Sequence, residues 1–101
     1  MNQIIIIGHL GADATADPIN DKFVIKFSVA TTEKYGDKSR TDWHQVKLWV
    51  SSDKVLPYLT KGTKVAVQGR QRNEKYEDKY FSYINADKME LLNSKKEEAP
   101  Y

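Results

Sequence analysis

Two tryptophans and a lysine share one side of the segment Thr41–Val50, TDWHQVKLWV. Taken with a period of two residues, Trp43, Lys47 and Trp49 fall together with Gln45, while the other side carries a histidine and three aliphatic residues. Such alternation predicts a half-buried β-strand with a core side and a solvent side. Two indoles around a cation on the solvent side suit the stacking of flat, negatively charged ligands, and unpaired nucleotides have this chemistry.

Four further stretches predict the strands around this one; residues 22–32 alternate in the same way, whereas the first stretch contains a continuous apolar run at residues 4–7. They are residues 3–10, 22–32, 63–70 and 81–92, so that Thr41–Val50 is the third of five expected strands. The segments between them are polar. We expect a turn-rich loop over residues 12–21, a mobile loop over 33–40, and a protruding hairpin over 71–80 that turns at Glu77, Asp78 and Lys79.

Residues 51–61 are the only helical candidate, because Val55, Leu56 and Leu59 supply an apolar stripe. Pro57 breaks a helix interior, so we expect a short helix that begins or kinks near it. Together the elements predict an all-β chain: an OB-fold, a five-stranded Greek-key barrel with one short helix between strands 3 and 4. We expect this domain to occupy residues 1–92, followed by a short polar, disordered tail over 93–101.

The composition limits the class of protein. At 101 residues the chain is long enough for one compact domain, and no apolar run approaches the ~18 residues of a membrane-spanning helix. The N-terminus lacks the basic region and small-residue site of a signal peptide. No cysteine is present for disulfides or thiolate metal sites, as in a cytosolic protein. With a net charge of only +2, a nucleic-acid partner requires basic residues gathered on one face.

Catalytic chemistry is not expected. The carboxylates lie in loops among lysines, without the apolar surroundings that would make one a general acid. Neither a G-x-S-x-G nor a phosphate-binding G-x-x-x-x-G-K motif occurs. His44 falls on the core side of its strand and His9 is the only other histidine, so we expect a hydrogen-bonded structural residue. We therefore predict no enzyme activity, no cofactor and no metal.

Five segments carry a resemblance to a known family. They are IIIIGHLGAD, FVIKFSVAT, TDWHQVKLWV, YLTKGTKVAVQGRQRNEKYED and INADKMELL, which follow one another over residues 2–92. In order and spacing they resemble the bacterial-type single-stranded DNA-binding proteins. The resemblance implies an OB barrel, assembled as a homotetramer, that coats single-stranded DNA in replication, recombination and repair. It also implies a cytoplasmic, nucleoid-associated protein.

The resemblance assigns roles to residues of this chain. It implies that bases stack on four aromatic side chains, Tyr35, Trp43, Trp49 and Tyr76. Tyrosine at positions 35 and 76 replaces a larger ring that is usual in the family, so we expect weaker stacking there, on a scale of about 1–3 kcal/mol per base. Basic residues on the strand faces and in the two loops are expected to contact phosphates: Lys34, Lys47, Arg70, Arg72 and Lys75.

A subunit interface also follows from the resemblance, at Ile4, Ile6 and His44. Four consecutive isoleucines, residues 4–7, place apolar groups on both sides of the first strand. That pattern is typical of a strand buried on both sides, as at an interface.

The C-terminus departs from the family pattern. Family members usually continue into a long Gly/Pro/Gln-rich linker and an acidic tip that recruits replication and repair proteins, whereas this chain ends SKKEEAPY. Either Glu97–Tyr101 form a minimal version of that tip, or the tail is only solvated. An alternative function is an OB-fold protein–protein adaptor in a primosome-like replication assembly, with the aromatics as interface hot spots.

Overall fold

Alternating β-branched and aromatic residues produce six strands and one short 3₁₀ helix in the computed structural model, which describes residues 1–92. In chain order these are β1 (Ile4–Leu10), β2 (Thr15–Ile19), β3 (Lys22–Tyr35), β4 (Lys38–Val50), η1 (Leu56–Tyr58), β5 (Lys64–Tyr76) and β6 (Lys79–Leu91). The tail predicted for residues 93–101 lies outside the described residues. Within residues 1–92 no helix is long and apolar enough to cross a membrane.

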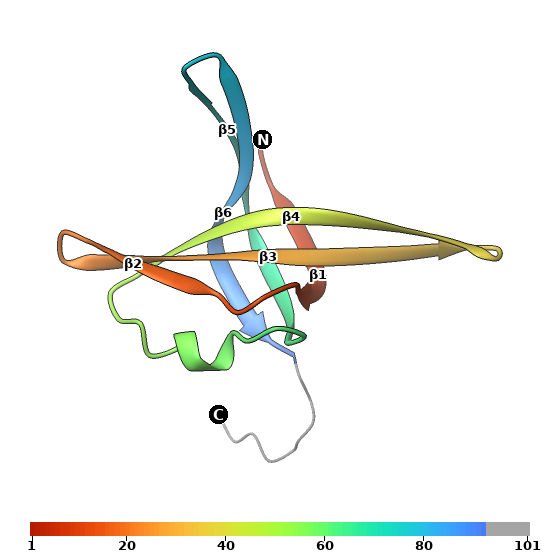
Figure 1. The fold of residues 1–101 in the computed structure, drawn as a ribbon, viewed down its shortest axis with the longest axis horizontal. Coiled ribbons are helices and arrows are strands. Elements are labelled where there is room, and N and C mark those ends of the chain that lie inside the picture. The colour runs from red at the N-terminus through yellow and green to blue at the C-terminus, as the bar shows by residue number, and fades with distance from the viewer. Residues whose placement is uncertain (93–101) are drawn as a thin grey trace.

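Strands β1, β3, β4, β5 and β6 close into the predicted barrel (Figure 1). The sheet order is β1-β5-β6-β4-β3-β2, and a further pairing of β1 with β3 joins its two sides. Strands β4 and β6 run parallel, and the other pairs run antiparallel. A β-carbon at Gly8 would overlap the carbonyl oxygen of Ala30, so glycine allows β1 and β3 to approach this closely. The OB architecture expected from the sequence is present.

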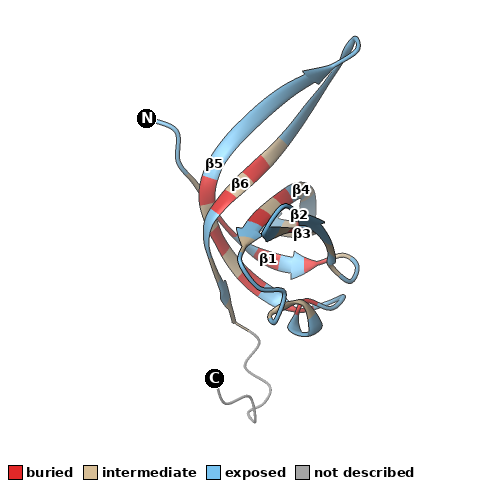
Figure 2. Ribbon diagram, turned by 90° about the vertical axis from the view of Figure 1, so that its left-hand side faces the viewer, coloured by how far each residue is buried: buried red, intermediate tan, exposed pale blue. Residues whose placement is uncertain are grey.

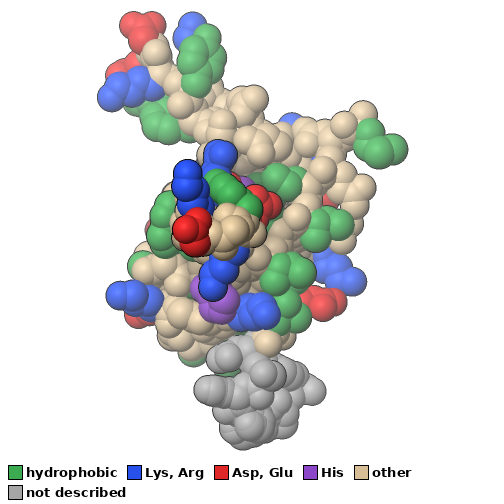
Figure 3. All heavy atoms as spheres, turned by 90° about the vertical axis from the view of Figure 1, so that its right-hand side faces the viewer, with side chains coloured by type: hydrophobic (Ala, Val, Ile, Leu, Met, Phe, Trp, Pro, Cys, Tyr) green, Lys and Arg blue, Asp and Glu red, His purple; other side chains and the backbone are tan. Residues whose placement is uncertain are grey.

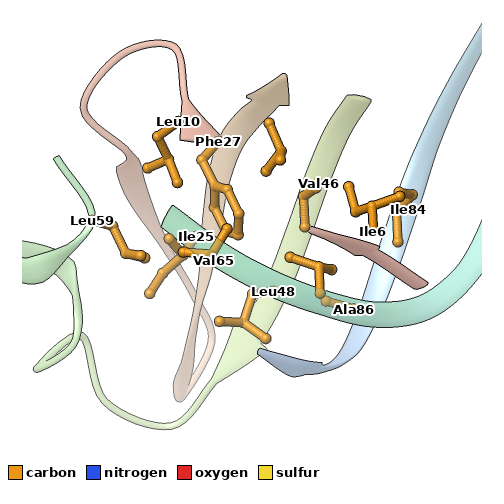
Figure 4. Close-up of a cluster of buried hydrophobic side chains, with 12 residues drawn as sticks. Ile6, Leu10, Ile25, Phe27, Val46, Leu48, Leu59, Val65, Ile84 and Ala86 are labelled. Atoms are coloured by element: carbon orange, nitrogen blue, oxygen red, sulfur yellow. The ribbon is translucent and has the colours of Figure 1, made fainter. Parts of the chain in front are cut away.

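The barrel interior is a single cluster of mainly aliphatic side chains (Figure 4). The predicted core sides of the strands supply it: Val46 and Leu48 come from β4, and Ile84 and Ala86 from β6. Leu59, just after η1, is fully buried in the same cluster. Figure 2 shows that burial is confined to the barrel, whereas the outer parts of the β5–β6 hairpin are exposed.

Two long hairpins extend beyond the barrel in different directions (Figure 1). The prediction of a hairpin over residues 71–80 is confirmed, with Glu77 at φ 54° in its turn. The prediction of a mobile loop over residues 33–40 is wrong. Strands β3 and β4 continue in register to the pair Tyr35 and Lys38, because Gly36 at φ 67° permits a tight turn.

Two other local predictions need correction. The expected loop over residues 12–21 contains β2, an edge strand paired with β3 through a tight turn at Asn20, which has φ 55°. Pro18 is tolerated at this edge, where its missing N–H costs no ladder hydrogen bond. The helical candidate over residues 51–61 is only the three-residue η1, because Pro57 fits a first turn and cannot continue a helix interior.

Candidate nucleic-acid interface

The outer side of β4 carries the aromatic and basic residues singled out in the sequence. Trp43 is 58% exposed and Trp49 is 46% exposed, whereas Val46 and Leu48 between them are buried. The predicted division of this strand into a core side and a solvent side is therefore confirmed. Figure 1 shows β4 running across the barrel, so its solvent side forms a broad surface.

Cross-strand register extends this surface onto β3. Lys26 lies directly opposite Lys47, and Ala30 lies directly opposite Trp43. Residues opposite one another in an antiparallel pair share a face of the sheet. Val24, opposite Trp49, has the same outward direction but is only 2% exposed, so it forms an apolar base beside that indole.

The same surface continues across β6 onto β5. Asn85 pairs with Lys47 on one side and with Arg70 on the other, and Tyr83 pairs with Arg72. Alternation along β5 then places Tyr76 on the face that carries Arg70 and Arg72. We call this surface, spanning β3, β4, β6 and β5, the outer face.

Lys75 does not lie on the outer face. It falls on the reverse side of the β5–β6 hairpin, directly opposite Tyr80, and its Nζ lies 5.6 Å from the centre of the Tyr80 ring. Of the five basic residues predicted to contact phosphate, Lys47, Arg70 and Arg72 are brought together on the outer face, and Lys75 is separated from them by the hairpin.

Tyr35 and Lys34 lie at the end of the β3–β4 hairpin, whose tip points at the viewer in Figure 3 amid Lys and Arg side chains. Counting from the pair Ala30 and Trp43, alternation gives Lys34 the same side as Trp43 and Tyr35 the opposite side. Both aromatic positions predicted on the hairpins, Tyr35 and Tyr76, are exposed.

A network of three side chains occupies the centre of the outer face. The Nζ of Lys47 lies 4.1 Å from the centre of the Tyr83 ring, and the Tyr83 hydroxyl donates a hydrogen bond of 2.9 Å to Oε2 of Glu74. Burial raises the pKa of the Tyr83 hydroxyl, and the hydrogen bond and charge of Glu74 raise it further, against an opposing effect of Arg72. Tyr83 is therefore a neutral donor to Glu74.

Two other cations of the outer face are paired with carboxylates. Lys26 Nζ lies 3.3 Å from Asp17 Oδ2, and Arg70 Nη2 lies 3.6 Å from Asp87 Oδ1. All four side chains are about half exposed, so these pairs contribute little to stability. They leave the surface basic but partly neutralised.

Comparison with known proteins identifies the family. Residues 1–92 match the model of the single-strand binding protein family. The chain belongs to this family.

Individual relatives agree with that assignment. A single-stranded DNA-binding protein of Neisseria meningitidis serogroup A is 34% identical over 116 aligned positions, which cover 100% of this chain and 67% of the relative. One from Rickettsia felis is 33% identical and covers 77% of this chain and 57% of the relative. A solved structure, a Plasmodium falciparum SSB complex with ssDNA, is similar with a TM-score of 0.77 and 31% identity, covering 91% of this chain and 93% of that chain.

In this family member His44 is held by a hydrogen bond. Its Nε2 lies 3.0 Å from Oγ1 of Thr31 on the neighbouring strand, and the pair is partly buried. Within residues 1–92, no group of three His, Cys, Asp or Glu residues is placed to hold a metal ion. The prediction of a hydrogen-bonded histidine is confirmed.

The two isoleucines predicted for a subunit interface lie on the barrel side of β1. Ile6 is 8% exposed and belongs to the barrel core, and Ile4 is partly buried against that core. The outward-facing isoleucines are Ile5, 61% exposed, and Ile7, 55% exposed. The barrel already uses one side of β1, so only the side with Ile5 and Ile7 remains available for a partner.

Two residues that shape the outer face are not evident from the sequence. Tyr83 is one of several aromatics in its strand, and its position over β4 depends on the parallel pairing of β4 with β6. A β-carbon at Gly11, directly after β1, would overlap the Trp43 ring. A glycine at the end of a strand is too common a signal to indicate such support.

Proposed function

We propose that this protein binds single-stranded DNA, without catalysis and with little sequence preference, and protects it during replication, recombination and repair. The observation that carries the proposal is the pair of exposed indoles, Trp43 and Trp49, on either side of Lys47 on one solvent-facing strand. Exposed aromatics with interspersed cations are the arrangement that binds unpaired bases and their phosphates. The family and the DNA complex of the Plasmodium relative support it.

Bases stack on Trp43 and Trp49 in this proposal, each contributing about 1–3 kcal/mol. Stacking uses the π-face that every base possesses, so the preference among bases is slight. Lys47, Arg70 and Arg72 contact phosphates along the same face. Tyr76 extends the stacking surface onto the β5–β6 hairpin, and Lys34 adds a cation on the Trp43 side of the β3–β4 hairpin. Tyr35 and Lys75 lie on the reverse sides of these hairpins, and in this proposal they contact DNA that passes around the hairpin edges.

Oligomerisation is a second part of the proposal. We place the contact between copies on the outer side of β1, where Ile5 and Ile7 are exposed beside a shallow hollow lined by Ala66, Gln68 and Lys88. Exposed apolar groups at alternate positions of one strand mark an interaction surface. A homotetramer is the assembly that we expect, in the cytoplasm at the nucleoid.

Tryptophan fluorescence tests the function directly, since the chain contains only two tryptophans and both lie on the proposed face. Titration with oligo-dT should quench the emission. The log of the affinity should fall with log salt at about −0.7 for each phosphate neutralised. An absence of quenching at low salt would contradict DNA binding and leave the aromatics as contacts of a protein partner.

Substitutions assign the stacking residues. Trp43→Ala and Trp49→Ala should each weaken binding at least about fivefold, the equivalent of roughly 1 kcal/mol. Tyr58→Ala is the matched control, because Tyr58 is an exposed aromatic of η1, outside the outer face. If neither tryptophan variant differs from that control, the stacking assignment is wrong even where DNA binding persists.

A further inference from the structure

We infer that Tyr83 is a positioning residue of the DNA-binding face, which holds the ammonium group of Lys47 over its ring and presents it as an un-neutralised cation to a phosphate beside Trp49. The inference rests on the proposed function and assigns one residue a role within it. Two contacts support it: Lys47 Nζ lies 4.1 Å from the centre of the Tyr83 ring, and a 2.9 Å hydrogen bond fixes the Tyr83 hydroxyl.

The manner in which the cation is held distinguishes Lys47 from Lys26 and Arg70. Lys26 is directly opposite Lys47 but pairs with Asp17, and Arg70 pairs with Asp87. A carboxylate cancels charge and competes with a phosphate for the cation. An aromatic ring attracts the cation through its quadrupole and leaves the net charge in place. Among the described residues Lys47 forms no ion pair, so no carboxylate in direct contact competes with a ligand for its ammonium group.

The ring itself is held on two sides. Glu74 accepts the hydrogen bond from the Tyr83 hydroxyl, and Tyr83 lies across from Arg72 on β5. The Lys47 side chain is half-buried, so its stem lies along the sheet and limits the positions of the ammonium. A base that stacked on Tyr83 would have to displace this ammonium. The geometry therefore favours a role for Tyr83 through Lys47 over a stacking role of its own.

The position along β4 indicates which nucleotide is contacted. Trp43, Lys47 and Trp49 share one face of β4. Trp49 is two residues after Lys47, a separation of about 7 Å, whereas Trp43 is four residues before it, a separation of about 14 Å. The cation is thus nearest to the backbone of a base stacked on Trp49. Because the ammonium is already held there before DNA binds, less side-chain conformational entropy is lost when the contact forms.

A double-mutant cycle tests this role. The affinity for fluorescein-labelled oligo-dT is measured by anisotropy for the parent, Tyr83→Leu, Lys47→Met and the double variant. Tyr83→Leu should weaken binding about threefold, the size of a partly exposed cation–π contact, and should have no further effect in the Lys47→Met background. Tyr83→Phe keeps the ring and loses only the hydrogen bond that anchors it, so it should weaken binding less than Tyr83→Leu does. In the Lys26→Gln background, which removes a cation held by a carboxylate, Tyr83→Leu should still weaken binding.

Three results would overturn the inference. Equal weakening by Tyr83→Leu in both the parent and the Lys47→Met background would show that Tyr83 contacts DNA itself. A Tyr83→Phe variant as weak as Tyr83→Leu would show that the contact between the ring and Lys47 does not carry the effect. No weakening at all would remove any role.

A measurement without DNA separates this inference from the proposed function. The ε-methylene protons of Lys47 should show an upfield ring-current shift in the NMR spectrum of the parent and of Tyr83→Phe. The shift should disappear in Tyr83→Leu, while the amide spectrum of the core strands reports that the variant is folded. A parent that shows the shift and does not bind oligo-dT would contradict the proposed function, and a parent without the shift would contradict the contact.

Discussion

The indole of Trp43 lies directly against the α-carbon of Gly11, where the chain leaves β1. A β-carbon at residue 11 would overlap Cζ3 and Cη2 of the ring. The Gly11 amide donates a hydrogen bond of 3.2 Å to the Ser28 carbonyl oxygen, which fixes the backbone at this point. An aromatic ring that is 58% exposed thus rests on main chain, and Gly11 determines where its stacking surface lies.

Replacing Gly11 by alanine should move the Trp43 ring and weaken oligo-dT binding about fivefold, a loss of roughly 1 kcal/mol of stacking. The ring is the far end of an exposed side chain, so it can shift without unfolding the barrel. Thermal unfolding should therefore be unchanged. In a Trp43→Ala background the Gly11→Ala change should have no effect on affinity, and an equal effect in both backgrounds would refute the support role.

Gly69 provides a contrasting case, in which a β-carbon would meet main chain. It would overlap the carbonyl oxygen of Asn85 beside the shift in register between β5 and β6 at Gln68 and Gly69. Backbone cannot move aside as a side chain does, so Gly69→Ala should destabilise the fold by about 1–3 kcal/mol. The midpoint of thermal unfolding should fall by roughly 4–8 °C per kcal/mol in a domain of this size. An unchanged midpoint would mean that the two strands can separate here freely.

The two sides of β1 should respond differently to substitution. Ile6→Ala leaves a cavity in the barrel core and should cost about 2–5 kcal/mol of stability. Ile5→Lys combined with Ile7→Lys changes only the exposed side and should leave the monomer fold intact. Light scattering should show a smaller assembly for the double lysine variant. If its mass equals that of the parent, the proposed contact between copies lies elsewhere.

The tryptophan-bearing face of β4 could be predicted from sequence because alternation has a period of two and the strand is half buried. Strand β2 could not, since Asp17, Pro18 and Asn20 are turn-forming residues and the strand pairs only as an edge. The outer parts of β3 and β4 have the composition of a loop, because Glu33, Lys34 and Lys38 are charged. They form a ribbon whose pairing needs no apolar burial, and composition does not reveal such pairing.

The outward direction of the strand residues of the site could be predicted from the sequence, whereas the contacts between residues of different strands could not. The outward direction of Arg70 and Arg72 follows from alternation along β5. The contact of Lys47 with Tyr83 does not, because it requires the parallel pairing of residues 46–48 with 84–86, which barrel closure creates. The register shift at Gln68 and Gly69 further changes which β6 residues face outward, and nothing in the local sequence specifies it.

The raised pKa of Tyr83 predicts an alkaline effect on stability. Below the ordinary tyrosine pKa of about 10, folded and unfolded chains both hold the proton. Above it the unfolded chain loses the proton first, so this contribution to stability is lost as pH rises through the folded pKa. Tyr83→Phe should therefore lose less stability than the parent above pH ~10 in chemical denaturation. Parallel curves for the two proteins would show that the pKa of Tyr83 is not raised in the folded protein.

The β3–β4 hairpin offers a matched pair of lysines for locating the DNA path. Alternation places Lys34 on the side of Trp43, whereas Lys38 is directly opposite Tyr35 on the other side. If the strand follows the outer face, Lys34→Gln should reduce the salt slope by about 0.7 and weaken binding, and Lys38→Gln should change neither. The two residues are similarly close to the turn and carry the same charge, so overall electrostatics cannot separate them. A larger effect of Lys38→Gln would place the DNA on the side of Tyr35, and that tyrosine, with Lys38 opposite it and Arg40 on the same side, would then be the true extension of the binding surface.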